Sequence, residues 1–149
     1  MKYLNRILFY SFIFAAAFAV SASAQTKHKH KSSAALNGYC PVAYQAMNKA
    51  VKGNPKFSST YEGVTYHFAA ESAKAMFDKD PAKYLPAYDG YCATAMSMGK
   101  KLKSNPKLFT VYKDHTYLFS NKKAKMMFDK NPAMFVEKAD KEFAALDKK

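Results

Sequence analysis

Apolar and polar residues alternate along two short stretches in the middle of the chain, residues 56–61 and 64–68, which are rich in aromatic and β-branched side chains. This alternation predicts two short strands, and Glu62-Gly63 between them predicts the tight turn of a β-hairpin. In residues 71–79, which follow the hairpin, apolar side chains recur at helical spacing. The pattern therefore predicts a hairpin followed by a helix.

The same pattern returns about 51 residues later. Residues 49–85 align without gaps on residues 100–136, with identical residues at 17 of 37 positions. Chance does not produce such agreement, so the chain contains an internal duplication. In the second copy Lys113-Asp114 is the predicted turn, and Ser120 is the predicted cap of a helix over residues 121–130.

Each copy closes with a further helix. Asp80-Pro81 and Asn131-Pro132 combine a capping side chain with proline at the first helical position, and the second of these helices is expected to run to about Leu146. The predicted class is therefore α+β, with units at residues 36–88 and 89–149. One unit holds too little core to fold alone, so we expect the two to bury their aromatic faces together as one pseudo-twofold domain.

The beginning of the chain has the pattern of a secretory signal. Lys2 and Arg6 precede an apolar run over residues 7–20, and Ala22-Ser23-Ala24 supplies the small residues that a signal peptidase accepts. These features predict a signal peptide over residues 1–24. A retained anchor is the alternative, but a run of about 14 residues is short of the roughly 20 that a spanning helix needs.

Export sets the expected compartment. Residues 25–35 include alternating lysines and histidines and contain no large apolar side chain. We therefore interpret them as a flexible basic lead. We expect the mature protein to be periplasmic or secreted, with no membrane span after signal cleavage.

The chain is strongly basic, with 24 lysines and arginines against 11 acidic residues and a net charge of +13. Nucleic acid is nevertheless not an expected partner, because the protein is predicted to be exported and its only arginine is Arg6, inside the predicted signal. The mature chain thus lacks the side chain that makes bidentate contacts to guanine and phosphate. The spread of lysines is more typical of solubility and of a general attraction to anionic surfaces.

Several motifs of the repeat resemble the YHS domain. The hairpin Tyr61-Glu62-Gly63-Val64-Thr65-Tyr66-His67-Phe68, the helical Phe77 and the closing Pro81-Ala82-Lys83-Tyr84 match the pattern of that family. Gly38-Tyr39-Cys40 and Gly90-Tyr91-Cys92 resemble the exported, stand-alone branch of such proteins. The resemblance implies an α+β binding protein and, in members that keep their cysteines, a transition-metal site.

The cysteines that bind metal in that family are missing here. Their positions fall on Ala43, Ala69 and Ala73 in the first copy, and the second copy has three other residues there: Ala95, Ser120 and Ala124. Any metal site in this chain must therefore use other side chains.

Two interpretations of the remaining cysteines stay open. Cys40 and Cys92 occupy equivalent places in the two copies, and an even pair in an exported protein favours a disulfide that would stabilise by about 4 kcal/mol. Alternatively, free thiols of Cys40 and Cys92 combine with Met96 and Met98, and with Met47 as a further donor, in a soft-donor site of the kind copper(I) prefers.

The second interpretation depends on where the methionines lie. We expect Met96 and Met98 to share one side of an extended segment, whereas Met76 and Met127 are expected to fill the core. His67 is expected to be solvated and His115 to lie at a turn, and neither is expected to bind a metal.

The chain contains no recognised catalytic motif, and no enzymatic activity is expected. The sequence therefore predicts an exported YHS-type binding protein that handles a transition metal such as copper. The alternatives are a disulfide-stabilised module that binds another exported protein without metal, and, with less support, a thiol-redox accessory protein.

Overall fold

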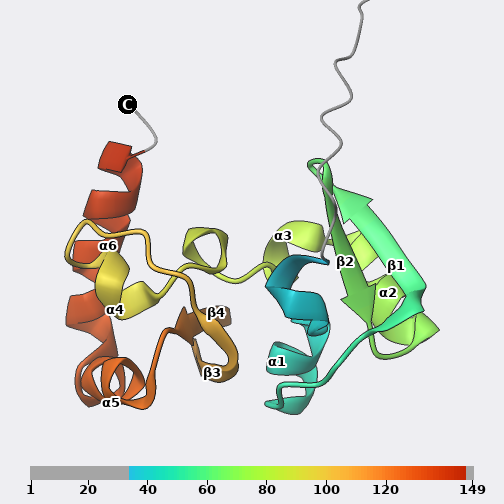
Figure 1. Cartoon of the computed structure of the whole chain (residues 1–149), viewed down its shortest axis with the longest axis horizontal. Helices are drawn as coiled ribbons and strands as arrows, with labels where there is room; N and C mark the ends of the chain where they lie inside the picture. Colours follow the sequence, from blue (N-terminus) through green and yellow to red (C-terminus); the bar gives the residue numbers. More distant parts are fainter. Residues whose placement is uncertain (1–33, 147–149) are drawn as a thin grey trace, which may run out of the picture.

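The computed structural model describes residues 34–146, which form two units of similar build side by side (Figure 1). The elements of the first unit are η1 (Ala35–Gly38), α1 (Pro41–Met47), β1 (Asn54–Tyr61), β2 (Val64–Phe68), α2 (Glu71–Lys79) and α3 (Pro81–Tyr84). Those of the second unit are η2 (Tyr88–Gly90), α4 (Ala93–Met96), β3 (Asn105–Tyr112), β4 (His115–Phe119), α5 (Lys122–Lys130) and α6 (Pro132–Leu146). The predicted α+β class is confirmed.

Both hairpins form where the alternation predicts them. In the first, Tyr61 pairs with Val64, and the turn residues Glu62 and Gly63 have φ values of 50° and 77°. Two successive left-handed residues match the right-handed twist of the strands, which explains the glycine. The second hairpin makes the same turn with Lys113 and Asp114, although neither is glycine.

The helix caps agree with the sequence at two of the three predicted positions. The side chain of Asp80 accepts a hydrogen bond from the Lys83 amide (3.3 Å), and that of Asn131 accepts one from the Met134 amide (3.3 Å). The prediction for Ser120 is wrong, because Asn121 lies directly before α5 and its side chain accepts from the Ala124 amide. The helices α1 and α4 were not predicted.

The aromatic side chains form two hydrophobic clusters rather than the single shared core that the duplication suggests. The buried members of the first cluster are Cys40, Val42, Ala43, Phe68, Phe77 and Tyr84. Those of the second are Tyr88, Cys92, Ala93, Ala95, Met96, Tyr117, Phe119, Ala124, Phe128, Phe135 and Ala139. Each cluster is organised around one helical phenylalanine, Phe77 or Phe128, whose ring lies 5.0 Å from the last phenylalanine of its hairpin.

Helix α1 joins the units by packing on the β3–β4 hairpin. The Tyr44 ring lies 4.9 Å from that of Phe109, and its hydroxyl donates a hydrogen bond to the Pro106 carbonyl (2.8 Å). A second link runs from the Ala87 amide to the Thr116 carbonyl (2.9 Å). The expected pseudo-twofold axis remains a prediction.

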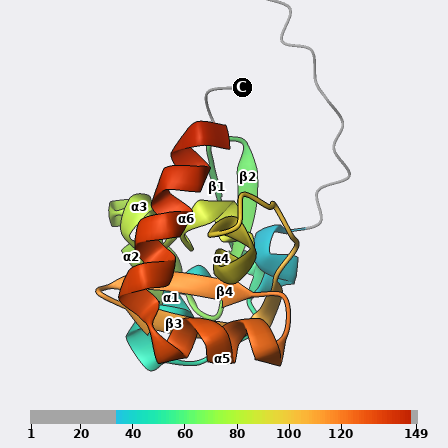
Figure 2. The same cartoon turned by 90° about the vertical axis from the view of Figure 1, so that its left-hand side faces the viewer.

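On its outer side the second unit carries the long helix α6, which runs beside α4 and crosses in front of the hairpin in the view of Figure 2. No helix within residues 34–146 is long and apolar enough to cross a membrane. The predicted signal peptide and the basic lead up to residue 33 lie outside the described residues.

Candidate functional site

Three sulfur-bearing side chains, Cys92, Met98 and Met127, line one cavity of about 240 Å³ beside helices α4 and α5. Cys92 directly precedes α4, and its backbone is held on both sides. Its amide donates to the Leu102 carbonyl (2.9 Å), and its carbonyl accepts from the Met96 amide (2.8 Å). The backbone of Cys92 is therefore fixed beside the cavity, and the residue is only 1% exposed.

The two thioethers reach the cavity from flexible side chains on opposite sides. Met98 follows α4 in a turn closed by its amide, which donates to the Ala95 carbonyl (3.0 Å), and by left-handed Gly99 (φ 69°). Met127 projects from α5. These residues are 55% and 38% exposed, which is unusual for methionine and leaves both accessible from solvent.

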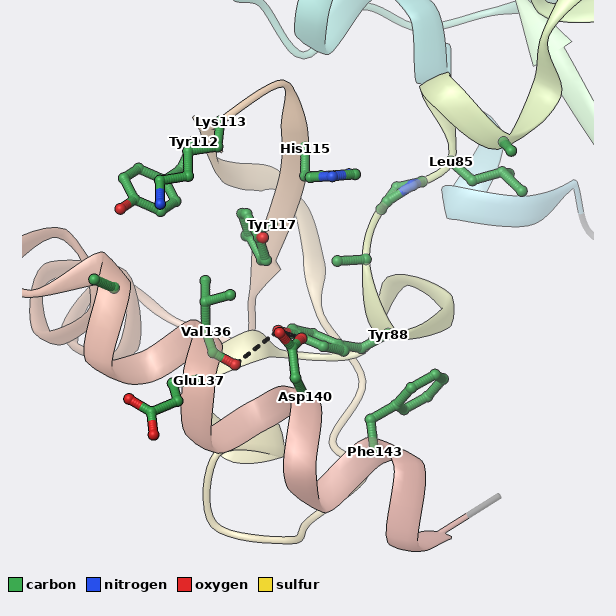
Figure 3. Close-up of a pocket in the computed structure, with 14 residues that line it drawn as sticks. Leu85, Tyr88, Tyr112, Lys113, His115, Tyr117, Val136, Glu137, Asp140 and Phe143 are labelled. Carbon is green, nitrogen blue, oxygen red and sulfur yellow. Dashed lines mark hydrogen bonds between the residues drawn. The ribbon is translucent and has the colours of Figure 1, made fainter. Parts of the chain in front are cut away.

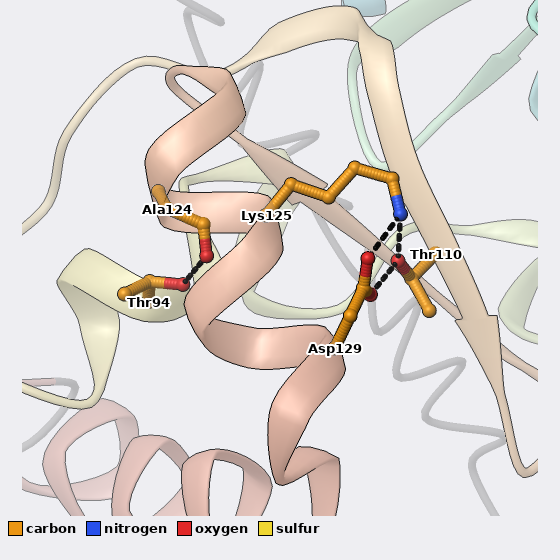
Figure 4. A network of polar contacts seen from close by, with 5 residues as sticks. All are labelled: Thr94, Thr110, Ala124, Lys125 and Asp129. Carbon is orange, nitrogen blue, oxygen red and sulfur yellow. Dashed lines mark hydrogen bonds and ion pairs between the residues drawn. The ribbon is translucent and has the colours of Figure 1, made fainter.

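Polar contacts hold the walls of the cavity together (Figure 4). The buried Thr94 hydroxyl donates to the Ala124 carbonyl (2.8 Å), which connects α4 to α5. On the other side of α5, the Lys125 ammonium contacts both the Asp129 carboxylate (2.6 Å) and the Thr110 hydroxyl (2.8 Å). Helix α5 is thus attached to both α4 and β3, so the cavity has a fixed frame.

The same cavity includes the places that the family's cysteines would occupy. Ala95, Ser120 and Ala124 all line it, so the three positions that sequence comparison identified do converge in space. Lys100 and Lys123 complete the charged lining, and no carboxylate is among the lining residues. Sulfur rather than oxygen donors are therefore available, which favours soft metal ions over calcium or magnesium.

The structure separates the four residues of the predicted metal site. Cys92 and Met98 line the cavity, but Met96 is fully buried in the second cluster and Cys40 is fully buried in the first. The expectation that Met96 and Met98 share one side of an extended segment is wrong. Met96 ends helix α4, and Ser97 after it is still in a helical conformation.

The predicted disulfide does not form. Both Cys40 and Cys92 are free, and each is buried in the cluster of its own unit. The pairing was expected because a shared core would bring equivalent positions together, and the two units have separate cores instead.

Sequence reasoning missed Met127, which it assigned to the core together with Met76. Both are exposed, at 38% and 42%. The repeat did indicate that the two methionines share one environment, because they occupy equivalent positions on α2 and α5. Helical spacing alone does not say which face of a helix a neighbouring element covers. Within residues 34–146, His, Cys, Asp and Glu form no group of three that could hold a metal, so the cavity depends on its thioethers.

A larger cavity, of about 760 Å³, lies between α6, the β3–β4 hairpin and the connection after α3 (Figure 3). His115 projects into it from the start of β4. On the opposite wall the Tyr88 hydroxyl donates to the Asp140 carboxylate (2.8 Å). Burial, followed by this hydrogen bond, raises the pKa of Tyr88 far above its usual value. His67 lies elsewhere, half-buried beside Gly38.

Comparison with known protein families identifies a YHS domain at residues 46–88. The match covers the first unit from the end of α1 to the start of η2, and the predicted second copy is not matched. No curated protein and no solved structure matches the chain.

Proposed function

We propose that the protein binds a soft transition-metal ion, with copper(I) as the best fit, in the cavity formed by Cys92, Met98 and Met127. The observation that carries the proposal is the convergence of one thiol and two accessible thioethers on one cavity. Soft thiolate and thioether donors are ligands that copper(I) prefers. In this role the metal is cargo that the protein holds.

The YHS domain supports the proposal indirectly. Such domains are commonly associated with the handling of heavy metals such as copper. The matched domain lies in the first unit and the cavity in the second, and the internal duplication relates the two. Because the positions of the family's cysteines line the cavity, the second unit would keep the location of the family site while replacing its ligands.

The first unit carries the same residue types at equivalent positions: Cys40, Met47 and Met76. The backbone there repeats that of the second unit. The Cys40 amide donates to the Val51 carbonyl at 2.9 Å, the distance found for Cys92 and Leu102. Met47 also precedes a left-handed residue, Asn48, as Met98 precedes Gly99. We therefore expect a second metal equivalent whose binding depends on Cys40.

Competition titration of copper(I) against a chromogenic chelator tests the main site. The change Cys92→Ser should weaken binding at that site by about 100-fold or more, since even outer-shell changes at metal sites weaken binding by 10- to 100-fold. Met127→Leu should weaken it by about tenfold, whereas Met126→Leu is the matched control. Met126 is 61% exposed on the same helix and does not line the cavity.

Equal affinity of wild type and Cys92→Ser would overturn the proposal. X-ray absorption of the copper-loaded protein gives an independent readout, because copper–sulfur scattering should predominate. If one copper(I) ion binds per chain and its binding depends on Cys92, the proposal for the main site stands and the expected site in the first unit is ruled out.

The structure gives little support to the two alternatives. A disulfide-stabilised module requires a crosslink that is not formed, and a dithiol redox protein requires two neighbouring thiols, whereas Cys40 and Cys92 lie in separate clusters. A protein partner remains compatible with the exposed methionines, because such side chains adapt to varied surfaces. In that case Met126→Leu and Met127→Leu should weaken partner binding by similar amounts. Neither variant, nor the wild type, would then bind copper.

We also propose that the protein acts after export, on the basis of its N-terminal pattern. Sequencing of the N-terminus of protein recovered from the periplasm or the medium should begin at Gln25. Recovery of only the uncleaved chain in the cytoplasm would contradict this.

A further inference from the structure

The cavity of about 760 Å³ is built by both units. Ala82 comes from α3, Leu85 and Pro86 come from the connection after it, and the other lining residues come from the second unit or its start. A volume of about 760 Å³ falls within the range of sites that bind small organic molecules. None of the three sulfur residues of the candidate metal site lines it, so its chemistry is independent of that site.

Aromatic rings form much of its lining: Tyr88, Tyr112, Tyr117 and Phe143. The Tyr88 ring lies 5.9 Å from Tyr117 and 5.6 Å from Phe143, so three of these rings are neighbours. Ring faces carry partial negative charge and attract organic cations. The lining indicates a ligand with an apolar or aromatic body.

Asp140 supplies the charge that gives the cavity a preferred ligand. One carboxylate oxygen, Oδ1, accepts the hydrogen bond from the Tyr88 hydroxyl (2.8 Å), which orients the group. The same hydroxyl lies 3.5 Å from the Val136 carbonyl, the contact drawn as a dashed line in Figure 3. The second carboxylate oxygen has no hydrogen-bond partner among the described residues. Burial and then the charge of Asp140 raise the pKa of Tyr117, so the field of this carboxylate reaches across the cavity.

The neighbouring charges leave Asp140 available. Glu137, on the same wall, is paired with Lys141 (2.8 Å), whereas Asp140 belongs to no ion pair within residues 34–146. Lys113 lies on the hairpin side, where its ammonium is 5.5 Å from the centre of the Tyr112 ring. That contact shows how a cation fits on these rings, and it places the basic group on the opposite wall from Asp140.

We infer that this cavity binds a small organic amine, with its protonated nitrogen at Asp140 and its apolar body against the tyrosine rings. Asp140 is exposed, so its second carboxylate oxygen is open to such a ligand, whose apolar body covers the ring faces at the same time. Because the cavity includes residues of both units, the bound amine also connects them, and it should raise the thermal midpoint of the whole protein.

Titrations of the full chain followed by amide NMR test this inference with two phenylethyl probes of similar size and opposite charge, 2-phenylethylammonium and 3-phenylpropanoate. The amine should bind about tenfold tighter and should shift the amides of Tyr88, Tyr117 and Val136. Asp140→Asn should reduce amine binding by about tenfold, because the amide oxygen still accepts from Tyr88 while the charge is lost. Glu142→Gln, an exposed acid on the same helix outside the cavity, is the matched control.

Three results would overturn the inference: tighter binding of the carboxylate probe, equal amine binding by wild type and Asp140→Asn, or shifts confined to residues outside the cavity. The copper proposal is unaffected by each of them, because it depends on a different cavity.

Discussion

The hydroxyl of Tyr44 makes a buried contact between the two units, and its removal gives a sharp test of how they are joined. The ring packs on Phe109, and the hydroxyl donates to the Pro106 carbonyl at 2.8 Å across 62 residues of sequence. The change Tyr44→Phe keeps the ring contact and deletes only this hydrogen bond. Tyr44 is fully buried, so no water replaces the lost donor at the native carbonyl.

The size of the stability loss follows from the Pro106 carbonyl, which keeps its place but loses its hydrogen-bond donor. A buried acceptor without its donor costs about 1–3 kcal/mol, and removal of the phenol's own desolvation cost offsets part of this. We expect a net loss of about 1.5 kcal/mol. A domain of this size is stable by about 5–15 kcal/mol, so the loss is measurable, and it corresponds to a fall of roughly 6 °C in the thermal midpoint.

Alkaline pH should remove the difference in stability between wild type and Tyr44→Phe. Burial raises the pKa of Tyr44 well above the value of about 10 that tyrosine has in the unfolded chain. The stability from this group is fully present below pH 10 and is lost as pH rises above it, because only the unfolded chain then releases the proton. At pH 11 the loss reaches about 1.4 kcal/mol, so Tyr44→Phe should be nearly as stable as wild type.

Urea unfolding followed by far-ultraviolet circular dichroism at pH 7, 9, 10 and 11 measures both effects. Tyr61→Phe is the control, since Tyr61 is half-buried in β1 and its hydroxyl has no hydrogen bond among the described residues. Other tyrosines with raised pKa are common to both proteins, and their contributions cancel. A difference below about 0.3 kcal/mol at pH 7, or one that stays constant to pH 11, would refute the reasoning.

Two further predictions concern single positions. Thr116 has a fully buried hydroxyl that finds no partner among the described residues, so Thr116→Val should raise stability by about 1 kcal/mol, and a lower urea midpoint would contradict this. Ala70 and Asn121 precede α2 and α5 with the same extended backbone (φ −154° in both), but only Asn121 caps its helix with its side chain. We therefore expect Ala70→Asn to stabilise and Asn121→Ala to destabilise by about 1 kcal/mol each, and changes of the same sign in thermal unfolding would show that the cap geometry is misassigned.

Most predictions that depended on near neighbours along the chain were confirmed. The Glu62-Gly63 turn, the helix from residue 71 to residue 79 and the Asp80 cap each follow from residues a few positions apart. Short-range steric and hydrogen-bonding preferences determine these features, and they hold whatever else the chain contacts. The Ser120 cap failed by one residue, because a short polar side chain at either of two adjacent positions gives the same pattern.

The location of the candidate metal site was predictable in part. The positions equivalent to the family's cysteines do share a cavity, because the duplicated sequence builds a duplicated backbone. The ligands could not be selected from the sequence, because Met96 and Met98 have the same chemistry. They differ only in burial, which depends on the neighbouring elements. Met127 was assigned to the core for the same reason.

By itself the sequence determined that the chain is duplicated and that each copy makes a hairpin followed by helices, because these features arise from local spacing and internal identity. Only the tertiary structure decided that each copy keeps its own core, that Tyr44 reaches the opposite hairpin and that Cys40 and Cys92 stay apart. These outcomes depend on contacts between surfaces that are far apart in the sequence. The burial of a side chain at such a contact is decided by residues outside its own local pattern.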